Sequence, residues 1–437
     1  MKNFVIPIIF VFLTFTANSV LAQPLLNVRD FGAVGDGNTD DTAAFQKALD
    51  AAATSDSQVV SVPRGNYRFG GSLNVPSGVT LKGVWESVPS HIGVRNKGQV
   101  KPTDDGTTFL VTGGQNKADA APFLTLDTNS TLKGVCIYYP DQKEDDIPFE
   151  YPWTIAMRGK NPAILDCELL NPYQAIDASK NERHLIRNIS GQPLRMGIFV
   201  DSIYDIGRIE NVHFNPWWSM KPKLFRWQME NGEAFVFARS DWQYVHNTFC
   251  FGYKIGYRFI ETKSGVCNGN FLGIGADDCY TAVVVDQSAP MGLLITNGEF
   301  VSFHGSEPTM VRVGDKNRGS IRFSNCSFWG PCRQIAVAEG LGTIGFSDCT
   351  FVQWGFKDKE GGKPNEKERL EVPAIQVLGG NLILRGCEFQ DKMPQVLLGE
   401  KVRKAIITEN LVRGEERIEN KAGEKTGIVI RDNASGN

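Results

Sequence analysis

The chain has 437 residues, of which 41% are apolar and 22% charged, with a formal net charge of −3. This balance is that of a folded protein and excludes intrinsic disorder. There is no basic excess, so nucleic acid is not an expected partner. The 45 glycines and 27 phenylalanines indicate many turns between β-prone segments, and so predict an all-β chain.

Residues 1–22 predict a secretory signal peptide. Lys2 precedes an apolar run from Phe4 to Phe15, and Val20 and Ala22 stand where small residues precede a cleavage site. The apolar run is shorter than the roughly 20 residues that span a bilayer. We therefore expect residues 23–437 to be secreted or periplasmic, without a membrane span.

Residues 27–50 read NVRDFGAVGDGNTDDTAAFQKALD. A short strand ends at Phe31, glycines form a loop, and Asn38 or Thr39 can cap a helix with an apolar stripe at helical spacing. This segment resembles the start of the pectate-lyase-superfamily, or glycoside-hydrolase-28-related, right-handed β-helix proteins. The resemblance implies a parallel β-helix whose first coil is covered by a short α-helix, within a cap of residues 27–56. It does not select a reaction, because that superfamily includes hydrolases, lyases, epimerases and phage tailspikes.

A triplet of a small residue, any residue, and an aromatic or aliphatic residue ends apolar strands along the rest of the chain. It occurs at Cys136–Tyr138, Cys167–Leu169, Val212–Phe214, Gly269–Phe271, Gly298–Phe300, Cys326–Phe328, Cys349–Phe351 and Cys387–Phe389. A longer gap predicts one further coil near Thr248. Coils of roughly 22 to 30 residues with variable insertions predict a right-handed parallel β-helix, with residues 23–437 as one domain.

The cysteines follow the same repeat. Cys136, Cys167, Cys326, Cys349 and Cys387 are predicted to share one inward rung of small buried residues. With nine cysteines, at least one thiol stays free, and the pairs Cys326–Cys332 and Cys267–Cys279 remain open. No group of cysteines and histidines has metal-ligand spacing, so no metal site is expected.

The long segment from Asn215 to Asp241 is the richest candidate for binding a sugar chain. Indole rings stack on sugar rings, while carboxylates and arginine bond hydroxyl or carboxyl groups. The predicted substrate-binding residues are Trp217, Trp218, Trp227, Trp242, Arg239, Glu230 and, from a later turn, His304. Alternatively, the tryptophans pack this segment against the β-helix, although the adjacent Trp217 and Trp218 cannot both face one core.

Paired carboxyl groups are what hydrolysis of a glycosidic bond usually requires. The predicted catalytic residues are Asp241, Glu233, Asp277 and Asp278, and further carboxyl candidates are Glu230, Asp286, Glu299 and Glu307. Asp277-Asp278 followed by His304-Gly305 resembles the Asp-Asp and Gly-His-Gly motifs of polygalacturonases, in the same order. Phe303 replaces the first glycine, however, and the Asn-Thr-Asp and Arg-Ile-Lys motifs are absent. A solvated turn is the alternative role for Asp277 and Asp278.

These residues predict an exported glycoside hydrolase that acts on a plant or algal, pectin-like polysaccharide and needs no cofactor. The first alternative is a lyase on a uronic-acid polymer, which would use Arg239 or His304 and Ca²⁺. The second is a binding or structural β-helix without catalysis. A groove lined only by acids would favour the hydrolase, and three or more acids with a basic residue would favour the lyase. Homo-oligomerisation stays open.

Overall fold

The computed structural model describes residues 25–99, 102, 105–302, 308–357, 368–423 and 427–436. The predicted signal peptide and His304 lie outside these residues. Within the described ranges, no helix combines the length and the apolar character that a membrane crossing needs.

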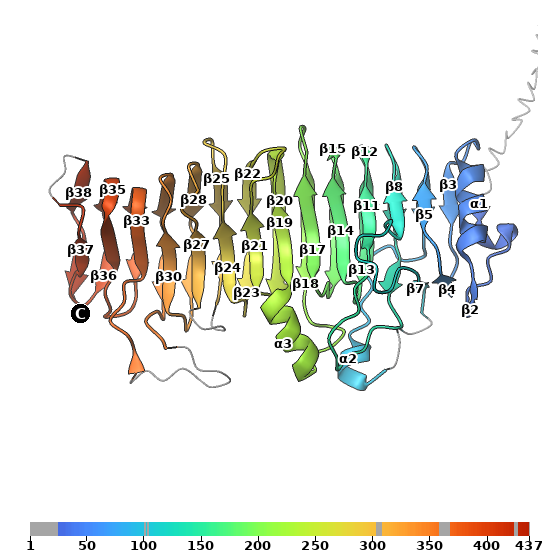
Figure 1. The fold of residues 1–437 in the computed structure, drawn as a ribbon, viewed down its shortest axis with the longest axis horizontal. Coiled ribbons are helices and arrows are strands. Elements are labelled where there is room, and N and C mark those ends of the chain that lie inside the picture. Colours follow the sequence, from blue (N-terminus) through green and yellow to red (C-terminus); the bar gives the residue numbers. More distant parts are fainter. Residues whose placement is uncertain are drawn as a thin grey trace, which may run out of the picture.

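The chain winds as a right-handed parallel β-helix, which confirms the predicted all-β fold. One short pair, β12 (Gly159–Lys160) with β15 (Asn181–Glu182), stands apart, and the other described strands form one continuous sheet. Each coil contributes to three faces in turn. Figure 1 shows the coils stacked along the long axis, with the helix α1 (Thr42–Ala52) at one end and the C-terminus at the other.

The first face contains β1 (Leu26–Asn27), β3 (Val59–Ser61), β6 (Thr80–Lys82), β9 (Thr131–Lys133), the starts of β13 (Ala163–Leu169), β16 (Leu185–Gly191), β18 (Arg208–Phe214) and β20 (Ser240–Phe251), then β22 (Cys267–Leu272), β25 (Leu293–Thr296), β28 (Ser320–Ser324), β31 (Thr343–Ser347), the ends of β33 (Ile375–Arg385) and β35 (Val396–Thr408), and β38 (Ile428–Arg431). The second face contains β2 (Asp36–Asp40), β4 (Gly65–Phe69), β7 (Thr107–Val111), β10 (Cys136–Tyr138), the ends of β13, β16, β18 and β20, then β23 (Gly275–Asp277), β26 (Glu299–Phe300), β29 (Ser327–Trp329), β32 (Thr350–Val352), β34 (Glu388–Phe389), β36 (Leu411–Arg413) and β39 (Ala434–Gly436). The third face contains β5 (Leu73–Val75), β8 (Leu124–Leu126), β11 (Trp153–Met157), β14 (Gln174–Ser179), β17 (Met196–Asp201), β19 (Glu233–Phe237), β21 (Ile255–Phe259), β24 (Thr281–Val285), β27 (Thr309–Val313), β30 (Gln334–Ala338), the starts of β33 and β35, and β37 (Ile418–Asn420).

The bend from the first face to the second has the same backbone conformation in coil after coil. One residue at this bend, called the corner residue below, has a positive φ. The corner residues are Gly134, Asp166, Asn188, Asn211, Asn247, Gly273, Asn297, Asn325, Asp348, Gly386, Glu409 and Asp432, with φ between 49° and 70°. Glycine, asparagine and aspartate adopt this conformation most readily. Neighbouring corners also bond: Asn211 Nδ2 donates to Asn188 Oδ1 at 2.9 Å, and Asn188 Nδ2 to Asp166 Oδ1 at 2.7 Å.

The corner residue sets which side chains of the second face point inward. Four of the five cysteines predicted to share a rung follow a corner directly and are buried in the main core: Cys167, Cys326, Cys349 and Cys387. The third residue after the corner is also inward. There the rings of Phe300, Phe328, Phe351 and Phe389 form a row with successive centroid distances of 5.3, 5.5 and 4.8 Å.

Two of the predicted triplets are wrong. Val135, and not Cys136, follows the corner at Gly134, so Cys136 is displaced by one residue and joins a second buried cluster outside the coil. A one-residue shift exchanges the two faces of a strand, which is why the prediction failed. Gly269–Phe271 belongs to the first-face strand β22. The further coil near Thr248 is present.

The nine cysteines are all buried and all free. Neither of the two pairs that the sequence left open is therefore a disulfide. Instead, the cysteines of the inward rung pack as small apolar side chains, the role that their regular spacing predicted.

The N-terminal helix covers the first coil, as expected from the resemblance. Phe45 of α1 is buried and packs its ring edge-on against Tyr67, Phe69 and Phe109 at centroid distances of 5.1, 4.9 and 5.6 Å. The predicted caps Asn38 and Thr39 lie in β2 instead. The residue before α1 is Asp41. Its carboxylate fixes the preceding loop by accepting hydrogen bonds from the backbone N–H groups of residues 34 and 35 at 2.7 and 3.1 Å.

Two insertions lie over the outward side of the second face in its N-terminal half. One leads into α2 (Gly93–Lys97) and the other contains α3 (Pro222–Asn231), and Figure 1 shows both on the same side of the molecule. They share the second buried cluster, which comprises Val94, Leu110, Cys136, Tyr138, Leu170, Leu194, Trp218 and Leu224. Arg95 links them by donating to the Pro216 carbonyl at 3.0 Å.

We predict that the corner conformation contributes measurable stability. Asn188→Gly and Asn188→Ala both remove the side-chain bonds, but only alanine meets the steric penalty of a positive φ. The alanine variant should therefore be less stable than the glycine variant by about 1–2 kcal/mol. Denaturant unfolding of the two variants checks this. Equal stabilities would show that the backbone conformation at the corner is not a constraint.

Candidate functional site

The outward side of the second face holds a pocket of about 340 Å³. Its floor comes from β23 and β26, where Asp277 and Glu299 face outward on adjacent coils, and its ends are Phe249 and Trp329. Gly275 gives the floor its depth, because a Cβ atom there would lie 2.9 Å from Cδ2 of Phe249. The remaining lining residues are Asn247, Thr248, Gly273, Ile274, Ala276, Asn297 and Val301. We call this the second-face pocket.

The two carboxyl groups of this pocket differ in their surroundings. Burial raises the pKa of Asp277 above its ordinary value, and the negative charges of Asp278 and Glu299 raise it further. The exposed Glu299 accepts a hydrogen bond from the indole N–H of Trp329 at 2.8 Å. Glu299 pairs with Gly275, so a coil spacing of ~4.8 Å and a rise of ~3.3 Å per residue put the Cα atoms of Asp277 and Glu299 about 8 Å apart. None of the described lining residues is basic.

Asp278 is placed differently from Asp277. It has a φ of 53° at the end of the second face, and its side chain is only 6% exposed. Asp278 therefore acts on the pocket through its charge, which helps to raise the pKa of Asp277. Phe249 and Trp329, the aromatic ends of the pocket, were missed at the sequence level. The corner asparagines Asn247 and Asn325 place them on the outward side, but this pattern can be used only when the conformation of the corner residues is known.

Aromatic rings continue from the second-face pocket toward the α3 insertion. His213 lies edge-on to Phe249 at a centroid distance of 4.9 Å and against Trp217 at 4.7 Å. Burial lowers the pKa of His213, so its ring is neutral at neutral pH. Its Nε2 atom is buried, and no hydrogen-bond partner for it exists among the described residues.

The other predicted tryptophans do not gather at this pocket. Trp218 is 2% exposed and packs in the second buried cluster, so its ring has no face free for a sugar. Trp227 is partly buried and lies against Tyr173 at a centroid distance of 6.0 Å. Trp242 is 61% exposed at the start of β20, and Glu230 is exposed on α3. Trp227 and Glu230 share α3, Trp242 lies on β20, and none of these four residues lines the second-face pocket.

Glu233 and Asp241 do not face each other. Glu233 begins the five-residue strand β19 and Asp241 stands past its end, so a strand of roughly 13 Å separates them. Each is ion-paired: Arg258 Nη1 lies 2.9 Å from Glu233 Oε1, and Arg239 Nη2 lies 2.8 Å from Asp241 Oδ2. A direct acid–base pair made of these two residues is therefore not assembled.

A second pocket, of about 550 Å³, lies on the third face. Arg258 lines it and bonds Asp286 Oδ2 through Nε and Nη2 at 3.0 and 2.9 Å, besides its ion pair with Glu233. The other ionisable lining residues are Glu261, Asp315 and Lys316. This third-face pocket thus combines three acids with two basic residues.

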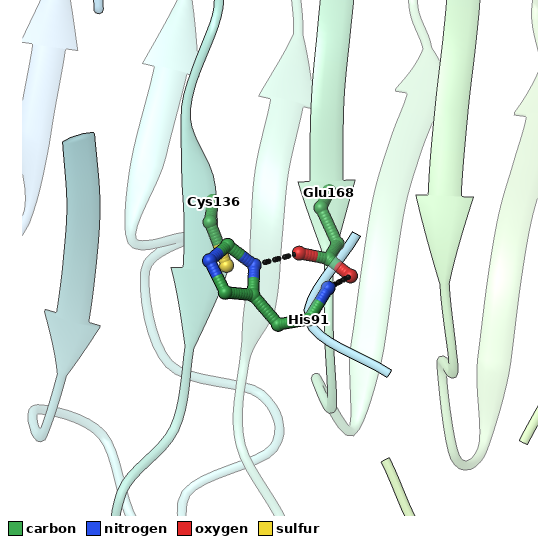
Figure 2. Close-up of side chains that lie close together, drawn as sticks. All are labelled: His91, Cys136 and Glu168. Carbon is green, nitrogen blue, oxygen red and sulfur yellow. Dashed lines mark hydrogen bonds and ion pairs between the residues drawn. The ribbon is translucent and has the colours of Figure 1, made fainter. Parts of the chain in front are cut away.

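Metal-ligand atoms converge at one further place, shown in Figure 2. His91, Cys136 and Glu168 are buried, and among the described residues they form the group whose donor atoms all lie within 4.8 Å of one another. The backbone N–H of His91 donates to Glu168 Oε1 at 2.9 Å, and the imidazole Nδ1 bonds Oε2. Burial and the Glu168 charge raise the pKa of the Cys136 thiol. We call these three residues the His91 triad.

Comparison with known proteins finds one protein family whose match lies in the N-terminal part of the chain. Residues 25–139 match the family described as rhamnogalacturonase A/epimerase, pectate lyase-like, which confirms the resemblance read from residues 27–50. Mannuronan C5-epimerase AlgE3 of Azotobacter vinelandii is 49% identical over 111 residues, which is 24% of this chain and 6% of that protein. Alginate lyase 7 of the same organism is 47% identical over 55 residues, or 13% and 6% of the two chains.

A solved structure extends the likeness in fold to 95% of the chain. The catalytic unit of a GH87 α-1,3-glucanase from Streptomyces thermodiastaticus superposes with a TM-score of 0.51 at 11% identity, covering 95% of this chain and 70% of that one. At this identity the likeness concerns the fold alone. The matched segments span between 6% and 12% of the curated relatives, so the fold is shared while the reaction is not transferred.

We predict that Asp277→Asn does not destabilise the protein at neutral pH. A pKa raised by folding means that ionised Asp277 is less favourable in the folded state than in the unfolded state. Its contribution is fully present at low pH and is lost as the pH rises through the raised pKa. The variant should therefore melt at or above the temperature of the unaltered protein at pH 7, and the difference should vanish near pH 3.

Asp241→Asn is the matched control, because it removes an ion pair instead of a desolvated charge. It should not raise the melting temperature at pH 7. If Asp277→Asn melts clearly below the unaltered protein at pH 7, Asp277 is stabilised in its charged form, and the electrostatic description of the second-face pocket fails.

Proposed function

We propose that this pectate-lyase-like β-helix is an exported carbohydrate-active enzyme that hydrolyses a plant or algal polysaccharide at the second-face pocket. The observation that carries the proposal is the pairing of Asp277, whose pKa is raised, with Glu299 in a pocket with aromatic ends. Two carboxyl groups with different surroundings are the arrangement that divides acid and base roles. Export rests on the predicted signal peptide.

In this proposal Asp277 is the general acid and protonates the glycosidic oxygen of the leaving sugar. Glu299 is the general base and takes a proton from water as that water attacks the anomeric carbon. The Trp329 indole N–H holds the Glu299 carboxylate in position. Because Glu299 activates a water and does not attack the sugar itself, this assignment of roles predicts inversion, for which carboxyl groups stand roughly 6.5–9.5 Å apart.

Binding of the sugar chain would use the outward rings. Phe249 and Trp329 bound the pocket along the axis of the β-helix, and their faces suit the apolar faces of sugar rings. Beyond Phe249, His213 and Trp217 extend this aromatic row toward α3. In this proposal the predicted platform residue Trp217 contacts one end of the substrate.

A second candidate is a lyase or C5-epimerase acting on a uronic-acid polymer at the third-face pocket. Its support is the three acids that stand with Arg258 and Lys316, together with relatives named as mannuronan C5-epimerases and an alginate lyase. Arginine would neutralise the uronate carboxylate and lower the barrier to removing the C5 proton. Carboxylate-rich surfaces of this kind also suit Ca²⁺.

Activity on a panel of pectins, alginate and neutral glucans separates the two candidates. The hydrolase releases reducing ends without ultraviolet absorbance, the lyase releases unsaturated absorbing products, and the epimerase changes the uronate composition read by NMR. Asp277→Asn and Glu299→Gln should each lower hydrolysis about 10²–10⁴-fold, while Arg258→Gln, the matched change in the third-face pocket, should leave the rate within about threefold of the unaltered protein. The reverse pattern supports the second candidate. If none of the polymers yields a product, both candidates are contradicted.

The pH–rate profile gives a separate prediction. Because Asp277 must carry its proton to act, kcat should fall as the pH rises through its raised pKa. Asp277→Glu should shift this limb of the profile, whereas Asp286→Asn should not. Proton NMR of the first product should show the inverted anomer. Retention of configuration would contradict the role assigned to Glu299.

A further inference from the structure

We propose that His91, Cys136 and Glu168 form a zinc site that fastens the insertion before α2 to the second face. The inference is independent of the proposed hydrolysis. His91 comes from the insertion, whereas Cys136 and Glu168 come from β10 and β13 and are paired neighbours on adjacent coils. Figure 2 shows the imidazole overlapping the Cys136 thiol in this view, with the Glu168 carboxylate beside the ring.

The donor set suits zinc. Thiolate sulfur, imidazole nitrogen and a carboxylate oxygen bind Zn²⁺ at about 2.0–2.3 Å, which brings tetrahedral ligand atoms to roughly 3.3–3.8 Å from one another. The three donor atoms here lie within 4.8 Å of one another. Zinc binding would require the hydrogen-bonded Nδ1 and Oε2 atoms to move apart. Ca²⁺ is excluded at this place because it takes six to eight oxygen ligands.

Charge and orientation favour the same ion. Glu168 and Cys136 are each 0% exposed and His91 is 5% exposed, and an uncompensated charge at such depth is costly. With Zn²⁺ bound, the thiolate and the carboxylate together balance the two positive charges. The His91 backbone N–H holds Glu168 Oε1 at 2.9 Å, as second-layer hydrogen bonds do around protein-bound metals. Oε2 is bonded to His91 Nδ1, and zinc would replace that hydrogen bond with one bond to each of the two atoms.

A fourth ligand position has a suitable neighbour in Thr108. Thr108 is the strand partner of Cys136 on the preceding coil and is 1% exposed. Its Oγ1 is buried, and no described residue hydrogen-bonds it. A buried hydroxyl without a partner is uncommon, and a metal-bound water would satisfy it. Three protein ligands and one water complete the tetrahedron that zinc prefers.

Cysteine, histidine and glutamate also occur together in nucleophilic enzymes, where the histidine deprotonates the thiol. Burial argues against that use here, because all three side chains are withdrawn from solvent under the insertion. An ion pair of His91 and Glu168 without a metal is the remaining arrangement. Each of these is an outcome of the test below.

The test measures metal in the full chain, stripped with a chelator under reducing conditions and then dialysed against Zn²⁺. We expect one zinc ion per chain after gel filtration. Co²⁺ in place of Zn²⁺ should give the intense thiolate-to-cobalt absorption of a cysteine ligand. Binding should strengthen with rising pH, because the thiol must lose its proton.

Cys136→Ser should abolish the cobalt absorption and lower bound zinc at least tenfold. Cys167→Ser is the matched control, since Cys167 is equally buried one coil further but lies in the inward rung. Should the Cys136 variant fail to fold, proteolysis of the unaltered chain replaces it: Zn²⁺ should slow cleavage within residues 84–99 roughly tenfold or more.

Three results overturn the proposal. The first is an unaltered chain that retains no zinc and shows no thiolate–cobalt absorption, which leaves a plain ion pair. The second is equal loss of metal in the Cys136 and Cys167 variants. The third is rapid alkylation of Cys136 by iodoacetamide in the native chain at neutral pH, which identifies an accessible nucleophile.

Discussion

The corner between the first and second faces is the constraint on which the rest of this structure depends. A positive φ at the corner residue of each coil from Gly134 onward turns the chain and fixes the side on which the following side chains of the second face lie. The bonds from Asn211 to Asn188 and from Asn188 to Asp166 keep successive corners in the same register. The inward rung of cysteines and the row of phenylalanines follow from this register. So do the outward positions of Asp277 and Glu299, which lie on the other side of the same strands.

Much of the fold was predictable because it is written locally. Residues 27–50 indicated the covered end, and the spacing of small and aromatic residues indicated the coils. The face and register to which each triplet belongs were harder to predict, because strands of both the first and the second face carry a small residue before an aromatic one. That ambiguity misplaced Gly269–Phe271, and the missing corner rule misplaced Cys136. For Cys136 a signal was available, because Val135 and not an asparagine, aspartate or glycine precedes it. Asn268 precedes Gly269, so the same signal does not distinguish that triplet.

The candidate sites were less predictable, since they join residues that no sequence window contains. Asp277 and Glu299 were both recognised as candidate acids, but their common pocket depends on Gly275, which pairs with Phe249 on one side and Glu299 on the other, and on the rings of Phe249 and Trp329. The His91 triad was harder still to predict, because its three residues come from an insertion and two coils and have no ligand-like spacing in the sequence. Glu233 and Asp241, close in the chain, are held apart by a strand and bonded to different arginines.

Repeating corners also make the coil a unit that can be added or removed. Asn297 and Asn325 occupy equivalent places 28 residues apart and are bonded to each other at 2.8 Å. A gene segment that begins at one corner and ends at the next can be duplicated or deleted while the surrounding strands keep their pairing. Each such event changes the molecule by one strand spacing, about 4.8 Å. Insertions and deletions of this kind can thereby lengthen or shorten the β-helix by whole coils, while the strand pairing on either side is kept.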